Sequence, residues 1–120
     1  VIFSHTGVAA LHNGDRYLGD TDIRAIAAKG GVIGIWPRGS GLPHVKDMGR
    51  HIDYIKKLVG IDHVGIGSDL RGMSSYSDGF GGEARFEGIR EALRDAGYSD
   101  PEVSQVMGGN FFRVWEAVTR

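Results

Sequence analysis

Short continuous runs of apolar residues alternate along the chain with longer stretches in which apolar residues recur every three or four positions. The continuous runs lie at Val1–Phe3, Gly31–Trp36 and Val64–Gly67. Runs of this length without polar alternation are typical of strands that are covered on both faces, as in a parallel sheet. The sequence therefore predicts three strands separated by helical segments.

The stretches with helical spacing predict amphipathic helices with one buried face. These helices are expected over Thr21–Lys29, Val45–Val59 and Glu83–Ala96, followed by a short helix that ends near Met107 and a final helix. The clearest buried stripe in this set consists of Val45, Met48, Ile52, Ile55 and Val59.

Polar residues and glycines mark the expected helix ends. Asp20 and Asn110 are each placed to cap the helix that follows, and Ser99 with Glu102 has the spacing of a capping box. Gly30 is expected to end the first helix in the left-handed conformation. The residues expected to face the core from the final helix are Phe111, Val114, Trp115 and Val118.

The order strand, helix, strand, helix, strand, helix, helix, helix predicts an α/β fold with a parallel sheet. A barrel and a doubly wound sheet fit the pattern equally well, but polar residues at two strand ends, His5 and Asp69, favour a barrel. A (β/α)8 TIM-type barrel needs about 250 residues. We therefore expect residues 1–120 to be the C-terminal fragment of a single barrel domain, with three βα units plus closing helices.

Composition narrows the possible partners and chemistry. The chain has 120 residues, no cysteine and a net charge of −1, so thiolate metal sites and disulfides are excluded and nothing indicates nucleic acid. No apolar run approaches the roughly 20 residues of a membrane span, and no signal-peptide pattern is present. We expect a cytoplasmic protein without a membrane partner, and any metal would need His, Asp or Glu ligands.

His5 and Asp69 are the candidates for chemistry because each follows a predicted strand. Groups at the C-terminal ends of parallel strands face the ligand in α/β enzymes. The alternative is structural: Asp69 could cap a loop or helix, and His5 could be an ordinary loop histidine.

Several segments, taken in order, resemble the C-terminal part of the membrane (renal) dipeptidase family of zinc peptidases, which belongs to the amidohydrolase-like barrels. The resembling segments are VIFSH at 1–5, DIRAIAAKGG at 22–31, HIDYI at 51–55, VGIDHVGIGSD at 59–69 and GGNFFRV at 108–114.

The resemblance implies a barrel that hydrolyses dipeptides with a binuclear zinc site. By this likeness, His5 is a metal ligand, Arg16 binds the terminal carboxylate of the substrate, and Asp69 is the catalytic acid/base. The chemistry of each residue suits its implied role. Neutral imidazole binds zinc, a guanidinium forks onto a carboxylate, and a carboxylate can carry a proton.

Two positions depart from the family's usual pattern. Arg71 stands where a second aspartate is frequent, and Tyr17 stands where an asparagine often follows the carboxylate-binding arginine. The other zinc ligands implied by the resemblance would lie before Val1, so we expect the isolated chain to bind zinc weakly and to lack activity. Its open strand edges predict self-association, for example as a homodimer.

Two other functions stay open at this point. One is a different amidohydrolase-like metal hydrolase that acts on amides, lactams or lactones. The other is a non-catalytic α/β module, if the upstream ligands are absent.

The remaining histidines and Trp36 are weaker candidates. His51 is expected on the polar side of its helix and His63 at the strand end far from the site, while His12 and His44 lie in or beside loops near it. Trp36 ends the middle strand, where it could line the substrate pocket or pack in the core.

Overall fold

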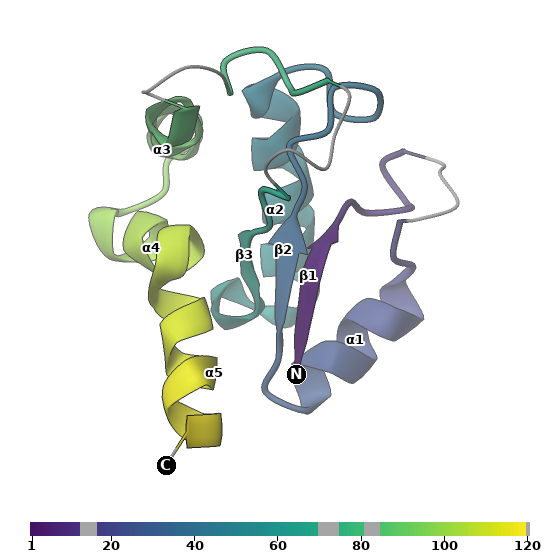
Figure 1. Cartoon of the computed structure of the whole chain (residues 1–120), viewed down its shortest axis with the longest axis vertical. Helices are drawn as coiled ribbons and strands as arrows, with labels where there is room; N and C mark the ends of the chain where they lie inside the picture. The colour runs from purple at the N-terminus through teal and green to yellow at the C-terminus, as the bar shows by residue number, and fades with distance from the viewer. Residues whose placement is uncertain (13–16, 70–74, 81–84, 120) are drawn as a thin grey trace.

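The computed structural model describes residues 1–12, 17–69, 75–80 and 85–119. Within this part of the chain, the strands are β1 (Ile2–Thr6), β2 (Val32–Ile35) and β3 (Val64–Ile66). They form one parallel sheet in the order β1-β2-β3, and their C-terminal ends point to the same edge (Figure 1). The predicted parallel α/β arrangement is therefore confirmed.

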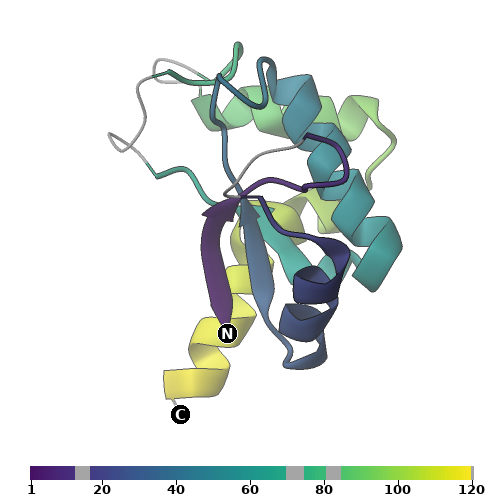
Figure 2. The same ribbon diagram turned by 90° about the vertical axis from the view of Figure 1, so that its right-hand side faces the viewer.

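The helices follow the predicted order. They are α1 (Asp20–Ala28), α2 (Val45–Val59), the single turn η1 (Ile61–His63), α3 (Arg85–Asp95), α4 (Asp100–Ser104), the π-helical turn η2 (Gln105–Gly109) and α5 (Asn110–Thr119). In the view turned by 90°, the loops beyond the strand ends gather at the top, and both chain termini lie in the lower half (Figure 2). No helix in the described ranges is both long and apolar enough to cross a membrane.

The main core lies between one face of the sheet and helices α1 and α2. Ile33 and Val64, which are paired across β2 and β3, are fully buried there with Ile23 of α1 and Ile52 of α2. Burying one such side chain contributes roughly 1.5–3 kcal/mol. The stripe predicted for Val45–Val59 is confirmed, because its first four members are buried and Val59 packs against the core.

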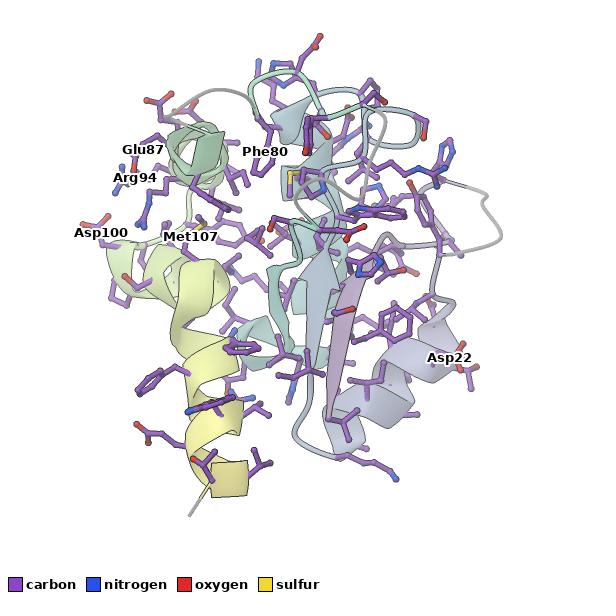
Figure 3. All side chains as sticks on the ribbon, in the orientation of Figure 1. Asp22, Phe80, Glu87, Arg94, Asp100 and Met107 are labelled. Carbon is purple, nitrogen blue, oxygen red and sulfur yellow. The ribbon has the colours of Figure 1, made fainter. Side chains whose placement is uncertain are left out.

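The same core continues as a cluster between α3 and the loop that precedes it. Ile89 and Leu93 are buried as predicted, whereas Phe86 is 37% exposed and meets the buried Phe80 in a T-shaped contact. Figure 3 shows Phe80 pointing into the space beside α3, while Glu87 and Arg94 of the same helix project outward. This cluster holds α3 against the rest of the fold.

The expected caps are confirmed in two places and wrong in two others. Ser99 and Glu102 form the predicted capping box, and Gly30 has φ +73°. Asp20 is not a cap: Gly19 is the N-cap of α1, and Asp20 instead accepts a hydrogen bond from the Tyr54 hydroxyl at 2.7 Å.

Asn110 is also not a cap, because its side chain is recruited by β3. Asn110 is 1% exposed, and its Nδ2 donates to the carbonyls of Ile61 at 2.6 Å and Val64 at 2.9 Å. The atom that would accept a helix N–H, Asn110 Oδ1, instead accepts a hydrogen bond from Gln105 Nε2 at 3.3 Å. Asn110 therefore ties α5 to the sheet.

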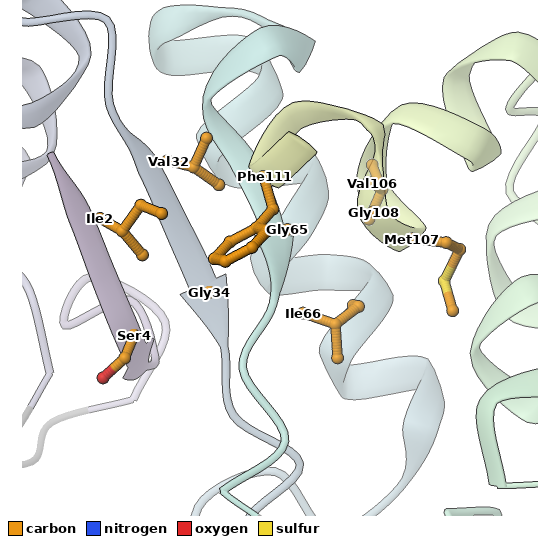
Figure 4. Close-up of a pocket in the computed structure, with 10 residues that line it drawn as sticks. All are labelled: Ile2, Ser4, Val32, Gly34, Gly65, Ile66, Val106, Met107, Gly108 and Phe111. Carbon is orange, nitrogen blue, oxygen red and sulfur yellow. The ribbon is translucent and has the colours of Figure 1, made fainter. Parts of the chain in front are cut away.

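The predicted core face of α5 is wrong except at one position. Val114 is buried, but exposure rises from 49% at Phe111 through 54% at Trp115 to 70% at Val118. The reason is geometric, since the described elements leave this side of α5 uncovered. The cavity next to it has a volume of about 260 Å³ and lies against the sheet face opposite α1 and α2 (Figure 4). Its walls include Ile2, Val32, Gly34, Gly65, Val106 and Phe111.

Candidate functional site at the strand ends

His5 and Asp69 lie close together although β2 separates their strands. His5 Nε2 is 3.7 Å from Asp69 Oδ2, and each side chain is about one-third exposed. Both therefore remain accessible from the edge where the strands end. The structure brings together two of the three residues that the sequence singles out.

Two glycines explain how the ends of β1 and β3 approach each other. The register of β1 against β2 shifts between Phe3 and Thr6, which pushes the Ser4 carbonyl across the sheet. A Cβ atom on Gly34 would lie 2.3 Å from the Ser4 carbonyl oxygen, and one on Gly67 would lie 1.8 Å from it. Because real Cβ atoms do not approach closer than 3.0 Å, only glycine fits at either position. The absence of two side chains thus creates the His5–Asp69 pair.

Asp69 has an unusual backbone conformation. Its φ of +45° is the only positive φ of a non-glycine residue among those described. Such left-handed conformations are uncommon outside glycine and asparagine or aspartate, and they cluster at functional sites. The conformation turns the chain at the end of β3 and leaves the carboxylate facing His5.

The imidazole of His5 is held from two sides. Ser4 Oγ lies 2.9 Å from His5 Nδ1, and the Trp36 indole meets the ring edge-on at 5.0 Å between centroids. If Nδ1 carries the proton and donates to Ser4, the lone pair of Nε2 is free on the side of Asp69. This is the arrangement in which a histidine binds a metal through one nitrogen while the other is oriented by a hydrogen bond.

A cavity of about 490 Å³ opens beside His5. It is lined by Phe3, Ser4, His5, Tyr17, Leu18, Asp22 and Trp36. Trp36 is therefore a pocket residue, although it is also almost completely buried. The predicted substrate-binding residue Arg16, like Arg71, lies outside the described residues.

Tyr17 packs across two loops of the site. Its ring touches Gly7, where a Cβ would lie 3.0 Å away, and its hydroxyl lies against Gly41, where a Cβ would lie only 1.7 Å away. The hydroxyl is buried and has no hydrogen-bond partner among the described residues. Burial raises the pKa of Tyr17, an effect that the nearby charge of Arg38 opposes. Tyr17, which departs from the family pattern, therefore packs between the loop after β1 and the loop after β2.

The loops after β2 and β3 pair with each other and form a wall next to Trp36, which lines the cavity. The Gly39 amide donates to the Ser75 carbonyl at 3.2 Å, and the Ser77 amide donates to the Pro37 carbonyl at 3.0 Å. The Ser77 hydroxyl donates to the Leu42 carbonyl. These bonds give the wall a fixed backbone although it has no regular secondary structure.

Arg38 is carried by this wall and was not identified from the sequence. Its guanidinium carbon lies 4.9 Å from the centroid of the Trp36 ring, which is a cation–π distance. The signal that could have identified it is its position, two residues beyond the end of an apolar strand, where α/β proteins place ligand-binding groups.

The placement of His51 on a polar helix face is wrong. His51 is 3% exposed, and its Nδ1 accepts a hydrogen bond from the Val8 amide at 2.9 Å. Burial is the main reason that the pKa of His51 falls from 6.5 to about 4, with the charge of Arg50 adding to the shift. A neutral imidazole thus supports the loop that follows β1.

The other histidines have structural contacts. His44 caps α2 by accepting from the Lys46 amide at 3.1 Å, and His63 Nδ1 lies 2.9 Å from the Gly31 carbonyl at the opposite end of the sheet. His12 packs on the Tyr17 ring at 5.5 Å. Within the described ranges, no three His, Asp or Glu side chains are grouped as metal ligands. The described part of the site therefore offers the imidazole of His5 and the carboxylates of Asp69 and Asp22, donor types that suit a zinc ion completed by further ligands.

The whole chain matches a family of known peptidases. The model of the membrane dipeptidase family, peptidase family M19, matches residues 1–120. The chain is 30% identical to the dipeptidase verJ of Clonostachys rogersoniana, over 98% of its own length and 31% of that protein. It is also 30% identical to the dipeptidase aclJ of Aspergillus oryzae, over 95% of its own length and 29% of that protein.

Solved structures show the same fold. The metallopeptidase of Rhodobacter sphaeroides, liganded with a phosphinate mimic of the dipeptide L-Ala-D-Ala, superposes with a TM-score of 0.88 at 24% identity. The alignment covers 96% of this chain and 35% of that one. The chain thus spans about a third of the length of these three relatives.

Proposed function

Because the chain belongs to the membrane dipeptidase family, peptidase family M19, we propose that it supplies part of the active site of a zinc-dependent dipeptidase. The observation that carries this proposal is the meeting of His5 and Asp69 at 3.7 Å beside an open cavity. An imidazole and a carboxylate brought together at the ends of two parallel strands are groups that metal-assisted hydrolysis uses.

We propose that residues 1–120 are the C-terminal three βα units of a (β/α)8 barrel. The parallel order of β1, β2 and β3 supports this, as does the share of the relatives that the chain covers. The uncovered sheet face fits the same arrangement, since glycines and small apolar residues there would line the barrel interior (Figure 4).

In this proposal His5 holds zinc through Nε2, while Ser4 orients the ring through Nδ1. The remaining ligands of a binuclear site would come from strands that precede Val1. When bound, zinc supplies Lewis-acid polarisation of the substrate carbonyl and lowers the pKa of water.

Asp69 is placed to move protons. Its carboxylate faces His5, which lines the cavity, so it can take a proton from the attacking water and give it to the nitrogen of the leaving amine. Arg16 would bind the terminal carboxylate of the dipeptide through its two parallel N–H donors. Tyr17, wedged between Gly7 and Gly41, would fix the loop that carries this arginine.

The test is hydrolysis by the zinc-loaded, full-length polypeptide that contains this chain. L-Ala-L-Ala and L-Ala-D-Ala are compared with a lactone, and the variant Asp69→Asn is compared with Asp95→Asn, which removes an exposed carboxylate from α3. We expect dipeptide turnover that falls about 10²- to 10⁴-fold in Asp69→Asn and is unchanged in Asp95→Asn. Turnover of the lactone alone, or full activity of Asp69→Asn, would contradict the proposal.

A further inference from the structure

Trp36 connects the catalytic pair to a cation that the proposed mechanism does not use. The centre of the indole lies 5.0 Å from the centre of the His5 ring and 4.9 Å from the guanidinium carbon of Arg38. The guanidinium carbon therefore lies no farther from the centre of the His5 ring than the sum of these two distances. Arg38 thus stacks on a residue that lines the cavity beside His5.

No described carboxylate neutralises Arg38. The two acidic residues at the site, Asp69 and Asp22, are respectively 3.7 Å from His5 and in the lining of the cavity, and neither forms an ion pair with Arg38. Arg38 is only partly exposed. A partly buried cation loses hydration without gaining a counter-charge, which is unfavourable unless a ligand supplies the charge.

Arg38 also lies near Tyr17, another residue that lines the cavity. Its charge acts on the Tyr17 hydroxyl and so opposes the effect of burial on the Tyr17 pKa. In the sequence, Tyr17 directly follows Arg16, the residue proposed to bind the C-terminal carboxylate of the substrate. A dipeptide bound with its C-terminal end towards Tyr17 would therefore bring its last side chain towards Arg38.

We propose that Arg38 is a specificity-determining residue that binds the side-chain carboxylate of Asp or Glu at the C-terminal position of a dipeptide substrate. The inference rests on the proposed function and adds a substrate class to it. A dipeptide held at His5 can reach Arg38 with its last side chain, because an extended dipeptide spans about 7 Å and an acidic side chain extends farther. Arg38 is preorganised for this task by its stacking on Trp36 and by the paired loops that carry it.

The experiment compares kcat/KM of the zinc-loaded full-length protein for Ala-Glu and Ala-Gln, with the second residue in either the L or the D form. The two substrates share the terminal carboxylate and differ only in side-chain charge. Arg38→Met removes the cation, and Arg94→Met is the matched control because Arg94 projects outward from α3 (Figure 3). A charge-assisted hydrogen bond predicts a Glu over Gln preference of roughly 10- to 100-fold.

The inference is supported if wild type and Arg94→Met share this preference and Arg38→Met loses it because its kcat/KM falls roughly tenfold or more further for Ala-Glu than for Ala-Gln. It is overturned if wild type has no preference, or if Arg38→Met keeps it. An equal loss for both substrates also overturns it, since Arg38 would then serve the terminal carboxylate or the structure alone.

A binding measurement separates this inference from the proposed function if neither dipeptide is hydrolysed. Isothermal titration calorimetry of the zinc-loaded full-length protein follows binding without requiring turnover. Binding of Ala-Glu that is absent with Ala-Gln and lost in Arg38→Met supports the acidic subsite although the hydrolytic proposal fails. An identical response to both dipeptides, or no response to either, overturns it.

Discussion

Replacing Gly67 with alanine tests how the fold brings the catalytic pair together. The new Cβ would lie 1.8 Å from the Ser4 carbonyl oxygen and 2.9 Å from the Cα of His5, both closer than the 3.0 Å that real Cβ atoms respect. Both neighbours are backbone atoms, so the end of β1 must move as a unit and carry His5 away from Asp69. Overpacking of this kind costs about 1–3 kcal/mol, and a displacement on the order of 1 Å in an active site can cost about 100-fold in rate.

The matched control is Gly49→Ala in α2, where a Cβ would meet no atom within 4 Å. Alanine in a helix interior stabilises by about 0.5–1 kcal/mol relative to glycine. Urea denaturation followed by circular dichroism, together with dipeptide turnover, distinguishes the two variants. We expect Gly67→Ala to lose both stability and activity and Gly49→Ala to lose neither. If Gly67→Ala matched wild type in both assays, the close approach of β1 and β3 would be refuted.

Three further predictions concern stability. The neutral His51 has a pKa of about 4 against 6.5 in the unfolded chain, so its contribution is complete above pH 6.5 and is lost as the pH falls towards 4, by on the order of 3 kcal/mol. Urea titrations at several pH values should show a shallower acid loss in His51→Gln than in wild type, and equal slopes would contradict this. Asn110→Asp cannot donate to the carbonyls of Ile61 and Val64, so its free energy of unfolding should be about 2–3 kcal/mol lower than that of wild type. An unchanged urea denaturation midpoint would show that these two hydrogen bonds contribute nothing to stability. Ser99→Ala removes one half of the capping box of α4, so its free energy of unfolding, measured by the same urea titration, should be about 1 kcal/mol lower than that of wild type. An equally or more stable variant would show that the cap does not stabilise α4.

Much of the fold could be predicted because it depends on local periodicity. The buried strand β2 and the helix α2 follow directly from which positions are apolar, and their bounds agree with the predicted ones to within a residue or two. The placement of His5 and Asp69 at strand ends also follows from local pattern, since parallel strands deliver their ends to one edge.

The errors arise where distant parts of the chain meet. The helical pattern places His51 on a polar face of its helix. In the structure His51 is buried, because it accepts a hydrogen bond from the Val8 amide, which is far away in the sequence. Asn110 was expected to cap its own helix and instead bonds to carbonyls at the start of β3. No local pattern contains these partners.

The apolar side of α5 shows a different limit. Phe111 and Trp115 have helical spacing that predicts burial, yet both are about half exposed. The spacing correctly indicates a face that needs cover, but it does not indicate whether the cover belongs to these 120 residues. The two glycines at the site present the same difficulty, because a missing side chain does not identify the backbone that requires its absence.

The central claim is that the ends of β1 and β3 form one side of a zinc site for hydrolysis. Anomalous diffraction at the zinc edge from crystals of the zinc-loaded full-length protein tests it most directly. We expect a zinc ion about 2.0–2.1 Å from His5 Nε2, with the Asp69 carboxylate facing the same ion from the end of β3. Zinc bound elsewhere, or His5 Nε2 turned away from an occupied site, would refute the proposed role of His5.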